Sequence, residues 1–333
     1  MAVILVLRAL GLGDLLTAVP ALRALRRARP ADRLLLAAPE ALAPLVPLVD
    51  ADVELVPTPG LAALPTVPGM PAVDLAVNLH GSGPESIDDL RALRPRRLLT
   101  HRHPAHPDLD GPEWTADSHE VERWCDLLAW YGVPADPRDL TLAVPTVPNP
   151  VPDAVVVHPG AASAARRWPP DRFAAVARTL AAETSSRVIV TGGAAERELA
   201  TTVATDAGLG SDAVFVGHDL ADLAALVAGA PLVVCGDTGV GHLATAFGTP
   251  SVLLFGPTPP NRWGPPADRP HHVVLWAGTT GDPHASTPDA GLLRITTSSV
   301  LDAARTLLAG GDPCRITTET AARSVSSAPA TSD

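Results

Sequence analysis

Short apolar runs alternate with amphipathic stretches along nearly the whole chain. This alternation is typical of parallel α/β proteins, in which a helix connects each strand to the next and covers the sheet. In the first half of the chain, the expected strands are Val3–Arg8, Arg33–Ala37, Val53–Val56, Val73–His80 and Arg97–Leu99. In the second half, they are Ala154–His158, Arg187–Thr191, Ala213–Val216, Leu232–Cys235 and Ser251–Phe255.

Apolar spacing predicts the helices between these strands. The clearest one covers Asp14–Ala28 and places five apolar side chains on one stripe, namely Leu15, Leu16, Val19, Leu22 and Leu25. Further helices are expected over Ser118–Tyr131, Asp171–Glu183 and Val300–Leu308. Ser118 is the expected N-cap of the helix that it begins, because serine side chains accept from the free amides of a first turn.

A cluster of prolines divides the chain into two halves. Four prolines fall within the nine residues 144–152, which excludes a helix or a central strand there. We therefore expect a Rossmann-like domain over 1–144, a linker over 145–152 and a second Rossmann-like domain over 153–310. The Ser/Thr/Ala-rich residues 311–333 are expected to form a disordered tail. Two doubly wound domains would place a ligand cleft between the carboxyl ends of their sheets.

The charged residues exclude several functions. The 333-residue chain has a formal net charge of −11, which disfavours DNA, RNA and anionic membranes as partners. All 25 basic residues are arginine, so a Schiff base, a lysine general base and a P-loop lysine are excluded. Arginine still permits bidentate recognition of phosphate.

Cysteine and histidine spacing gives no sign of a disulfide framework or a metal site. Cys125, Cys235 and Cys314 lie far apart, which favours reduced thiols in a cytosolic protein. The histidines lack metal-ligand spacing to nearby acids, so no metal is expected. The apolar start of the chain runs directly into Arg8, which predicts a first strand rather than a signal peptide. No apolar run is long enough to span a membrane.

The first candidate site is the run Gly11-Leu12-Gly13-Asp14, which follows the first strand and opens a helix. Two glycines allow a tight turn and a close approach to a ligand. A dinucleotide fingerprint would need a third glycine where the chain has Leu16, so the motif of an NAD-dependent dehydrogenase is incomplete. Asp14 is then either a catalytic carboxylate at the mouth of the cleft or a cap of its own helix.

The second half offers similar turns at the ends of its strands. Small residues there expose backbone amides, and arginine, threonine and histidine side chains add donors for a phosphate. An acid after a central strand could meet ribose hydroxyls. The candidate donor-binding residues are Gly160, Ala161, Arg166, Trp168, Gly192, Glu196, Asp237, Thr238, Gly239, Val240, Gly241 and His242.

One local stretch is basic although the protein is acidic. It contains Arg91, Arg94, Arg96 and Arg97, and it continues through three nearby histidines. Such a stretch either receives an anionic acceptor or forms a solvated face, and the sequence does not distinguish these two interpretations.

Three motifs in a fixed order resemble glycosyltransferase family 9, the ADP-heptose:lipopolysaccharide heptosyltransferase-like enzymes. They are the run around Asp14, the segment from Pro159-Gly160-Ala161 to Arg166-Arg167-Trp168-Pro169, and Asp237-Thr238-Gly239 with His242-Leu243 followed by Phe255-Gly256-Pro257. The similarity runs from about residue 3 to residue 309. It implies a GT-B fold, with acceptor binding in the first domain and nucleotide-sugar binding in the second.

The resemblance also implies roles for individual residues. The family's catalytic aspartate falls on Asp14, as the general base for the acceptor hydroxyl, with Gly11 and Gly13 beside it. The phosphate-binding turn falls on residues 237–241. Arg166 stands where the family typically has a lysine. The implied enzyme is inverting and needs no metal and no cofactor.

The implied substrates are a nucleoside-diphosphate sugar, ADP- or GDP-linked, and a glycan, lipid-linked or natural-product acceptor. The expected location is the cytoplasm, with contact to the inner face of the membrane left open. Two alternatives stay open beside this transferase. One is a nucleotide-sugar 2-epimerase on the same fold, and the other is a non-catalytic nucleotide-sugar-binding protein.

Overall fold

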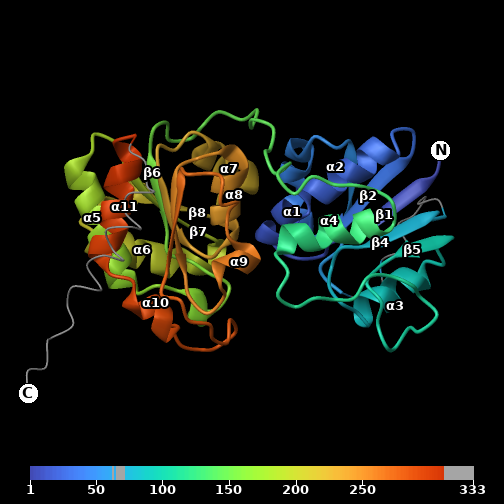
Figure 1. Ribbon diagram of the computed structural model, residues 1–333. Coiled ribbons are helices and arrows are strands. Elements are labelled where there is room, and N and C mark those ends of the chain that lie inside the picture. Colours follow the sequence, from blue (N-terminus) through green and yellow to red (C-terminus); the bar gives the residue numbers. More distant parts are fainter. Residues whose placement is uncertain (62–63, 65–71, 311–333) are drawn as a thin grey trace, which may run out of the picture.

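A computed structural model describes residues 1–61, 64 and 72–310 of the chain. The expected tail over 311–333, and most of a proline-rich loop expected over Pro57–Pro71, lie outside these described residues. Within them, the chain forms two parallel sheets that lie side by side (Figure 1).

The first sheet has the strand order β3-β2-β1-β4-β5, and all of its neighbouring strands are parallel. Its strands are β1 (Val3–Leu7), β2 (Arg33–Ala38), β3 (Val53–Pro57), β4 (Leu75–Asn78) and β5 (Arg97–Leu99). The connecting helices are α1 (Leu12–Thr17), α2 (Val19–Ala28), the 3₁₀ helix η1 (Glu40–Val49), α3 (Glu85–Ala92) and α4 (Glu120–Trp130). Strand order reverses at β1, where β2 and β4 lie on opposite sides, so a crevice opens at the carboxyl end of β1.

The second sheet has the order β11-β10-β9-β6-β7-β8 and is also parallel. Its strands are β6 (Val155–His158), β7 (Val188–Gly192), β8 (Val214–Val216), β9 (Val233–Gly236), β10 (Ser251–Phe255) and β11 (His272–Trp276). Its helices are α5 (Pro170–Glu183), α6 (Arg197–Asp206), α7 (Leu220–Ala228), α8 (Gly239–Phe247), α9 (Pro260–Trp263), α10 (Ala290–Arg294) and α11 (Thr297–Leu308). Short 3₁₀ turns are η2 (Ala164–Arg166), η3 (Ala194–Glu196) and η4 (Ser211–Ala213).

Every strand expected from the sequence is present, and β11 is an additional one. The prediction of one continuous helix over Asp14–Ala28 was wrong, because the chain forms two helices that meet at Ala18. Pro20 explains the break, since it has no amide hydrogen to donate into a continuous helix. The N-cap expected at Ser118 was also wrong. His119 occupies that position, and its Nδ1 accepts from the Val121 amide at 3.2 Å.

The stretch over 145–152 contains no helix or strand and connects the two halves. These halves pack directly against each other, with α1 against α8 and α4 against α9 (Figure 1). One apolar cluster crosses the boundary and includes Leu16 of α1 and Leu243 of α8. The limits of the two domains stay a prediction.

Polar contacts reinforce this boundary. The Leu142 amide donates to the Ala246 carbonyl at 3.1 Å, and the Arg269 guanidinium reaches the Thr245 and Arg138 carbonyls at 2.7 and 3.2 Å. His119 Nε2 lies 3.0 Å from the Gly264 carbonyl. The carboxyl ends of β1 and β9 are therefore held near each other, since α1 and α8 begin directly after these strands.

Candidate functional site

The first turns of α1 and α8 meet where the two halves of the chain join. A Cβ atom placed on Gly239 would lie 2.8 Å from the side chain of Leu12. A Cβ atom on Gly13 would lie 2.9 Å from the His242 ring. Only glycine at these two positions permits this approach without displacement of a neighbour. The structure thus brings the Asp14 turn and the glycine-rich turn after β9 to one place.

Asp14 sits in the first turn of α1, and its two carboxylate oxygens have different partners. Oδ2 accepts from the Gly11 amide at 3.2 Å, and Oδ1 accepts from Arg8 NH2 at 3.1 Å. Its side chain is 25% exposed, so it remains accessible. Burial raises the pKa of Asp14 above its ordinary value, while the positive charge of Arg8 acts against this shift. Asp14 does cap its own helix, because its Oδ2 accepts from the Gly11 amide. This contact is compatible with a catalytic role of the same carboxylate.

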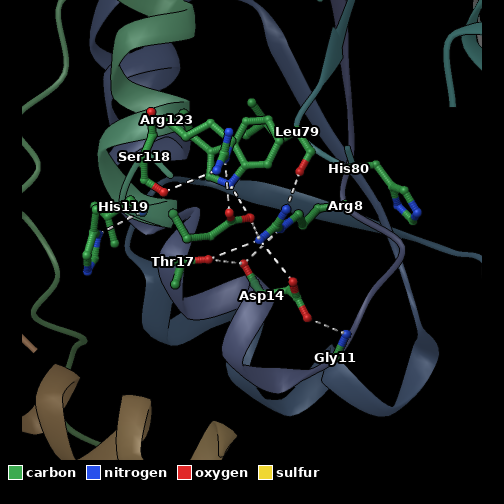
Figure 2. A network of polar contacts seen from close by, with 12 residues as sticks. Arg8, Gly11, Asp14, Thr17, Leu79, His80, Ser118, His119 and Arg123 are labelled. Carbon is green, nitrogen blue, oxygen red and sulfur yellow. Dashed lines mark hydrogen bonds and ion pairs between the residues drawn. The ribbon is translucent and has the colours of Figure 1, made fainter. Parts of the chain in front are cut away.

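Arg8, directly after β1, organises this corner of the first domain (Figure 2). Its side chain is 1% exposed. Nε donates to the Asp14 carbonyl at 2.9 Å, and NH1 donates to the Leu79 carbonyl at 2.5 Å. NH2 faces Asp14 Oδ1, Thr17 Oγ1 and Glu120 at 3.1, 3.1 and 2.9 Å. A buried guanidinium is tolerated here because every nitrogen has an acceptor and two carboxylates balance its charge.

Arg8 and Glu120 did not emerge as site residues in the sequence. Arg8 ends an apolar run and resembles the first polar residue after a strand, and Glu120 resembles an ordinary acid in the first turn of a helix. The 112 residues between them hide their contact from any local pattern. Arginine side chains are rarely buried unless they are paired. The burial of Arg8 can therefore be recognised only from the folded structure.

In the second domain, Arg166 and Asp237 form the charged part of the turn after β9. Arg166 NH1 lies 3.6 Å from Asp237 Oδ2, and the Asp237 side chain is 6% exposed. Burial raises the pKa of Asp237, and the charge of Arg166 opposes that shift. Asp237 therefore holds Arg166 in place at the edge of the turn, with the arginine side chain 24% exposed.

Thr238 is the N-cap of α8, and its buried Oγ1 has no hydrogen-bond partner among the described residues. The amides of Gly239 and Val240 belong to the first turn of the helix, which leaves them without intrahelical acceptors. The Gly241 amide is not free, because it donates to the Thr238 carbonyl at 3.0 Å. This turn therefore presents a hydroxyl, two amides and a helix N-terminus to an anion.

His242 lies beside the same turn. Its ring packs edge-on against Trp263, with 5.9 Å between ring centroids, and touches Gly13 of the first domain. Burial lowers the pKa of His242 to about 4, so the ring is neutral near pH 7. His242 can therefore serve as a neutral hydrogen-bond partner and not as a cation.

Glu196 closes the neighbouring strand end. Its Oε2 accepts from the Gly193 amide at 2.9 Å, and a Cβ atom on Gly160 would lie 2.3 Å from its carboxylate. A Cβ on Gly192 would also touch Glu196, at 3.2 Å. The structure thus brings Gly160, Gly192 and Glu196 together at the carboxyl ends of β6 and β7. Contact of Glu196 with a ribose stays a prediction.

Trp168, predicted to bind the donor, has a side chain that is buried within the second domain. Its side chain is 1% exposed, it packs edge-on against Phe173, and its Nε1 donates to the Ile295 carbonyl at 3.1 Å. It belongs to the core of the second domain. Ala161 is also buried, so any ligand contact there must come from its backbone.

Comparison with known proteins identifies the family. The family model described as "Glycosyltransferase family 9 (heptosyltransferase)" matches residues 112–288, which is more than half of the chain. The chain belongs to glycosyltransferase family 9. A curated relative, lipopolysaccharide heptosyltransferase 1 of Pseudomonas aeruginosa, is 36% identical over 152 residues. That match covers 44% of this chain and spans only 42% of the length of the relative.

Solved structures of this family share the fold. A family 9 glycosyltransferase from Veillonella parvula has a TM-score of 0.75 at 22% identity, and the match covers 93% of this chain and 98% of that one. E. coli ADP-heptose LPS heptosyltransferase II has a TM-score of 0.74 at 21% identity, with 93% and 99% covered. The E. coli heptosyltransferase WaaC, solved with ADP, has a TM-score of 0.68 at 20% identity, with 92% and 99% covered. The expected GT-B fold of two parallel-sheet domains is confirmed.

In this family 9 chain, two of the four arginines of the basic stretch in the first domain pair with acids. Arg91 pairs with Asp108 at 2.8 Å, and Arg96 pairs with Asp74 at 3.3 Å. Arg97 lies over the Tyr131 ring, 5.5 Å from its centroid. These contacts favour a solvated, ion-paired face, and a role of the stretch toward an acceptor stays a prediction.

One cavity is lined by none of the predicted site residues. It has a volume of about 780 Å³ and is lined by α4, residues 137–140 and residues 260–274. A much smaller pocket is lined by Asp237, Thr238, Gly241 and His242. The described residues contain no cluster of three metal-ligating side chains, and none of their helices is long and apolar enough to span a membrane.

Proposed function

We propose that this chain is an inverting glycosyltransferase that moves a heptose, or a related sugar, from a nucleoside-diphosphate donor to an acceptor hydroxyl. Family membership supports the transferase class. The observation that carries the assignment is the meeting of α1 and α8, which brings the helix turn that carries Asp14 against the N-terminal turn of α8. A base on one domain and a diphosphate turn on the other are the two parts that such a transfer needs.

In the proposed reaction, the acceptor oxygen attacks the anomeric carbon of the donor sugar while the bond to the nucleoside diphosphate breaks. Asp14 takes the proton of the acceptor hydroxyl. Attack from the face opposite the leaving group inverts the configuration of that carbon. The raised pKa of Asp14 suits this role, because a stronger base accepts the proton more readily.

The leaving diphosphate gains negative charge as the bond breaks. Arg166, the Thr238 hydroxyl and the N-terminus of α8 would stabilise that charge. Arg166 takes the place of the family's usual lysine, and its planar guanidinium can bind two phosphate oxygens at once. We propose that these groups make a divalent cation unnecessary for the chemical step.

The proposed donor is ADP-linked, and GDP is the second candidate. The E. coli relative solved with ADP supports adenine, and the Pseudomonas relative is named for a heptose transfer to lipopolysaccharide. The acceptor assigned to this chain is a glycan or a lipid-linked saccharide, held by the first domain. The proposed site of action is the cytoplasm.

Donor binding is tested first by thermal unfolding in EDTA with ADP, GDP, UDP and NAD. We expect ADP to raise the melting temperature by several degrees at 100 times its Kd, since a ligand that binds only the folded state stabilises it by about 2.7 kcal/mol. Stabilisation by NAD alone would contradict the family's donor class.

Catalysis is tested with ADP-heptose and heptose-accepting saccharides. Release of ADP that requires the acceptor supports a transferase. Conversion of the donor sugar to its 2-epimer without an acceptor would support the epimerase instead. Donor binding without any turnover, over a panel of acceptors, would favour a non-catalytic binding protein.

A further inference from the structure

Glu120 is a buried carboxylate that the proposed reaction does not yet use. It lies in the first turn of α4 and is 8% exposed. Its Oε1 accepts from Arg8 NH2 at 2.9 Å and from Trp124 Nε1 at 3.1 Å. Its Oε2 accepts from Arg123 Nε at 3.2 Å. Three side-chain donors on one buried carboxylate distinguish it from the solvated acids of a helix surface.

Arg8 connects Glu120 to Asp14 through a single nitrogen. Nε and NH1 of Arg8 are directed at the Asp14 and Leu79 carbonyls, which fixes the plane of the guanidinium. NH2 is left with three acceptors, namely Asp14 Oδ1, Thr17 Oγ1 and Glu120 Oε1. A guanidinium NH2 has only two hydrogens, so the two carboxylates compete for the same donor group (Figure 2).

Three further charged or titratable groups lie near this pair. Arg123 binds Glu120 and is held by the Thr115 and Ser118 carbonyls at 2.6 and 3.1 Å. His80 Nδ1 accepts from the Ala9 amide at 3.2 Å, next to Arg8. Burial lowers the pKa of His80 and of His242 to about 4 each, so neither ring carries charge near pH 7. The side-chain charges that act on the pKa of Asp14 are those of Arg8, which lowers it, and Glu120, which raises it.

We propose that Glu120 is a positioning residue for Asp14: it shares the Arg8 guanidinium and thereby leaves the Asp14 carboxylate free to take the proton of the acceptor. This inference rests on the proposed function. Without the charge of Glu120, Arg8 NH2 would have Asp14 as its only carboxylate partner. Burial and Glu120 both raise the pKa of Asp14 and Arg8 lowers it, so the loss of Glu120 weakens the base.

The decisive variant is Glu120→Gln, which keeps the size of the side chain and removes its charge. Glu122→Gln is the matched control, because Glu122 lies on the same turn of α4 and is exposed. For E120Q we expect kcat to fall about tenfold, the donor KM to stay unchanged, and the acid limb of kcat/KM to move about one unit to lower pH. E122Q should match the unmodified enzyme in all three measurements.

Thr17→Val separates charge from hydrogen bonding. It removes another acceptor of Arg8 NH2 without removing a charge, so the acid limb should stay where it is. Arg123→Gln is predicted to act in the opposite direction. It leaves the charge of Glu120 less balanced, so the acid limb should move to higher pH. This variant decides the question if E120Q fails to fold.

Asp14→Asn distinguishes this inference from the proposed function. If D14N transfers sugar normally, the proposed base is wrong. If D14N is inactive while folded E120Q has the pH profile of E122Q, only the role of Glu120 is overturned. In the D14N background, E120Q should lower the residual rate no further, because Glu120 acts through Asp14. An additive loss there would also overturn the inference.

Discussion

Buried charge is the property that sets the residues of this site apart. Arg8 and Glu120 are both nearly inaccessible, and each is held by several fixed partners. Asp14 is partly accessible and is bound more loosely, by one amide and one guanidinium nitrogen. The fixed charges thus lie behind the reactive one, which is the order expected for a preorganised base.

The raised pKa of Asp14 has a consequence for stability. A folded-state pKa above the unfolded value means that ionised Asp14 destabilises the fold, so this cost is absent at low pH and appears as pH rises above about 4. We therefore expect D14N to be more stable than the unmodified protein at pH 7. The melting temperatures of both proteins from pH 3.5 to pH 8 would check this. A D14N protein that melts lower at pH 7 would contradict the sign.

Glycine-rich turns and strands of this protein were predictable, and its charged network was not. The turns at Asp14 and Asp237 follow strands, and parallel strands end at one edge, so their meeting could be expected. The contact of Arg8 with Glu120 depends on where α4 docks, which no local pattern specifies. The burial of Trp168 was unpredictable for the same reason, because it depends on α5 and residue 295.

At the scale of elements, the approach of α1 to α8 is the contact on which the site depends. β11 shows what the sequence leaves out at this scale. Its apolar run is only three residues long and stands between two histidines and Trp276. The strand lies at the edge of the sheet. By contrast, β1 and β10 are buried along their whole length, as expected for strands that are covered on both faces.

The α1–α8 contact is tested by Gly239→Ala. The added methyl group would meet Leu12 at 2.8 Å, so the two helix starts must separate. We expect transfer to fall about tenfold or more, because small displacements of catalytic groups have large effects on rate. Leu12→Gly in the same chain removes the obstructing Cβ, Cγ and Cδ2 atoms and should restore much of the activity. A G239A enzyme of normal activity would show that this distance does not matter.

At the scale of the whole molecule, the two domains are connected by more than the proline-rich linker. An apolar cluster crosses the boundary, and polar contacts from the segment 260–274 reach α4 and residue 138. His119 is notable because it contacts Gly264 of the second domain while its neighbour Glu120 contacts Arg8. A displacement between the domains is therefore transmitted to the residues that hold Asp14.

Arg269→Ala tests this connection, since Arg269 joins α8 to the Arg138 carbonyl of the first half. We expect faster amide hydrogen exchange in residues 137–140 and 264–270, with both sheets unchanged. Arg294→Ala is a suitable control, because Arg294 binds two acceptors within the second domain. Equal changes at residues 137–140 in both variants would contradict a bridging role of Arg269.

The pair of glycines where α1 meets α8 also bears on how such an enzyme can diversify. Under the proposed function, the acceptor is recognised by the first half of the chain and the donor by the second. A lineage could exchange one half and so acquire a new acceptor while it keeps the old donor. The exchange succeeds only if both parents carry a small residue at positions 13 and 239, because a side chain from either parent would obstruct the other. Two residues without side chains thus determine which halves can be recombined.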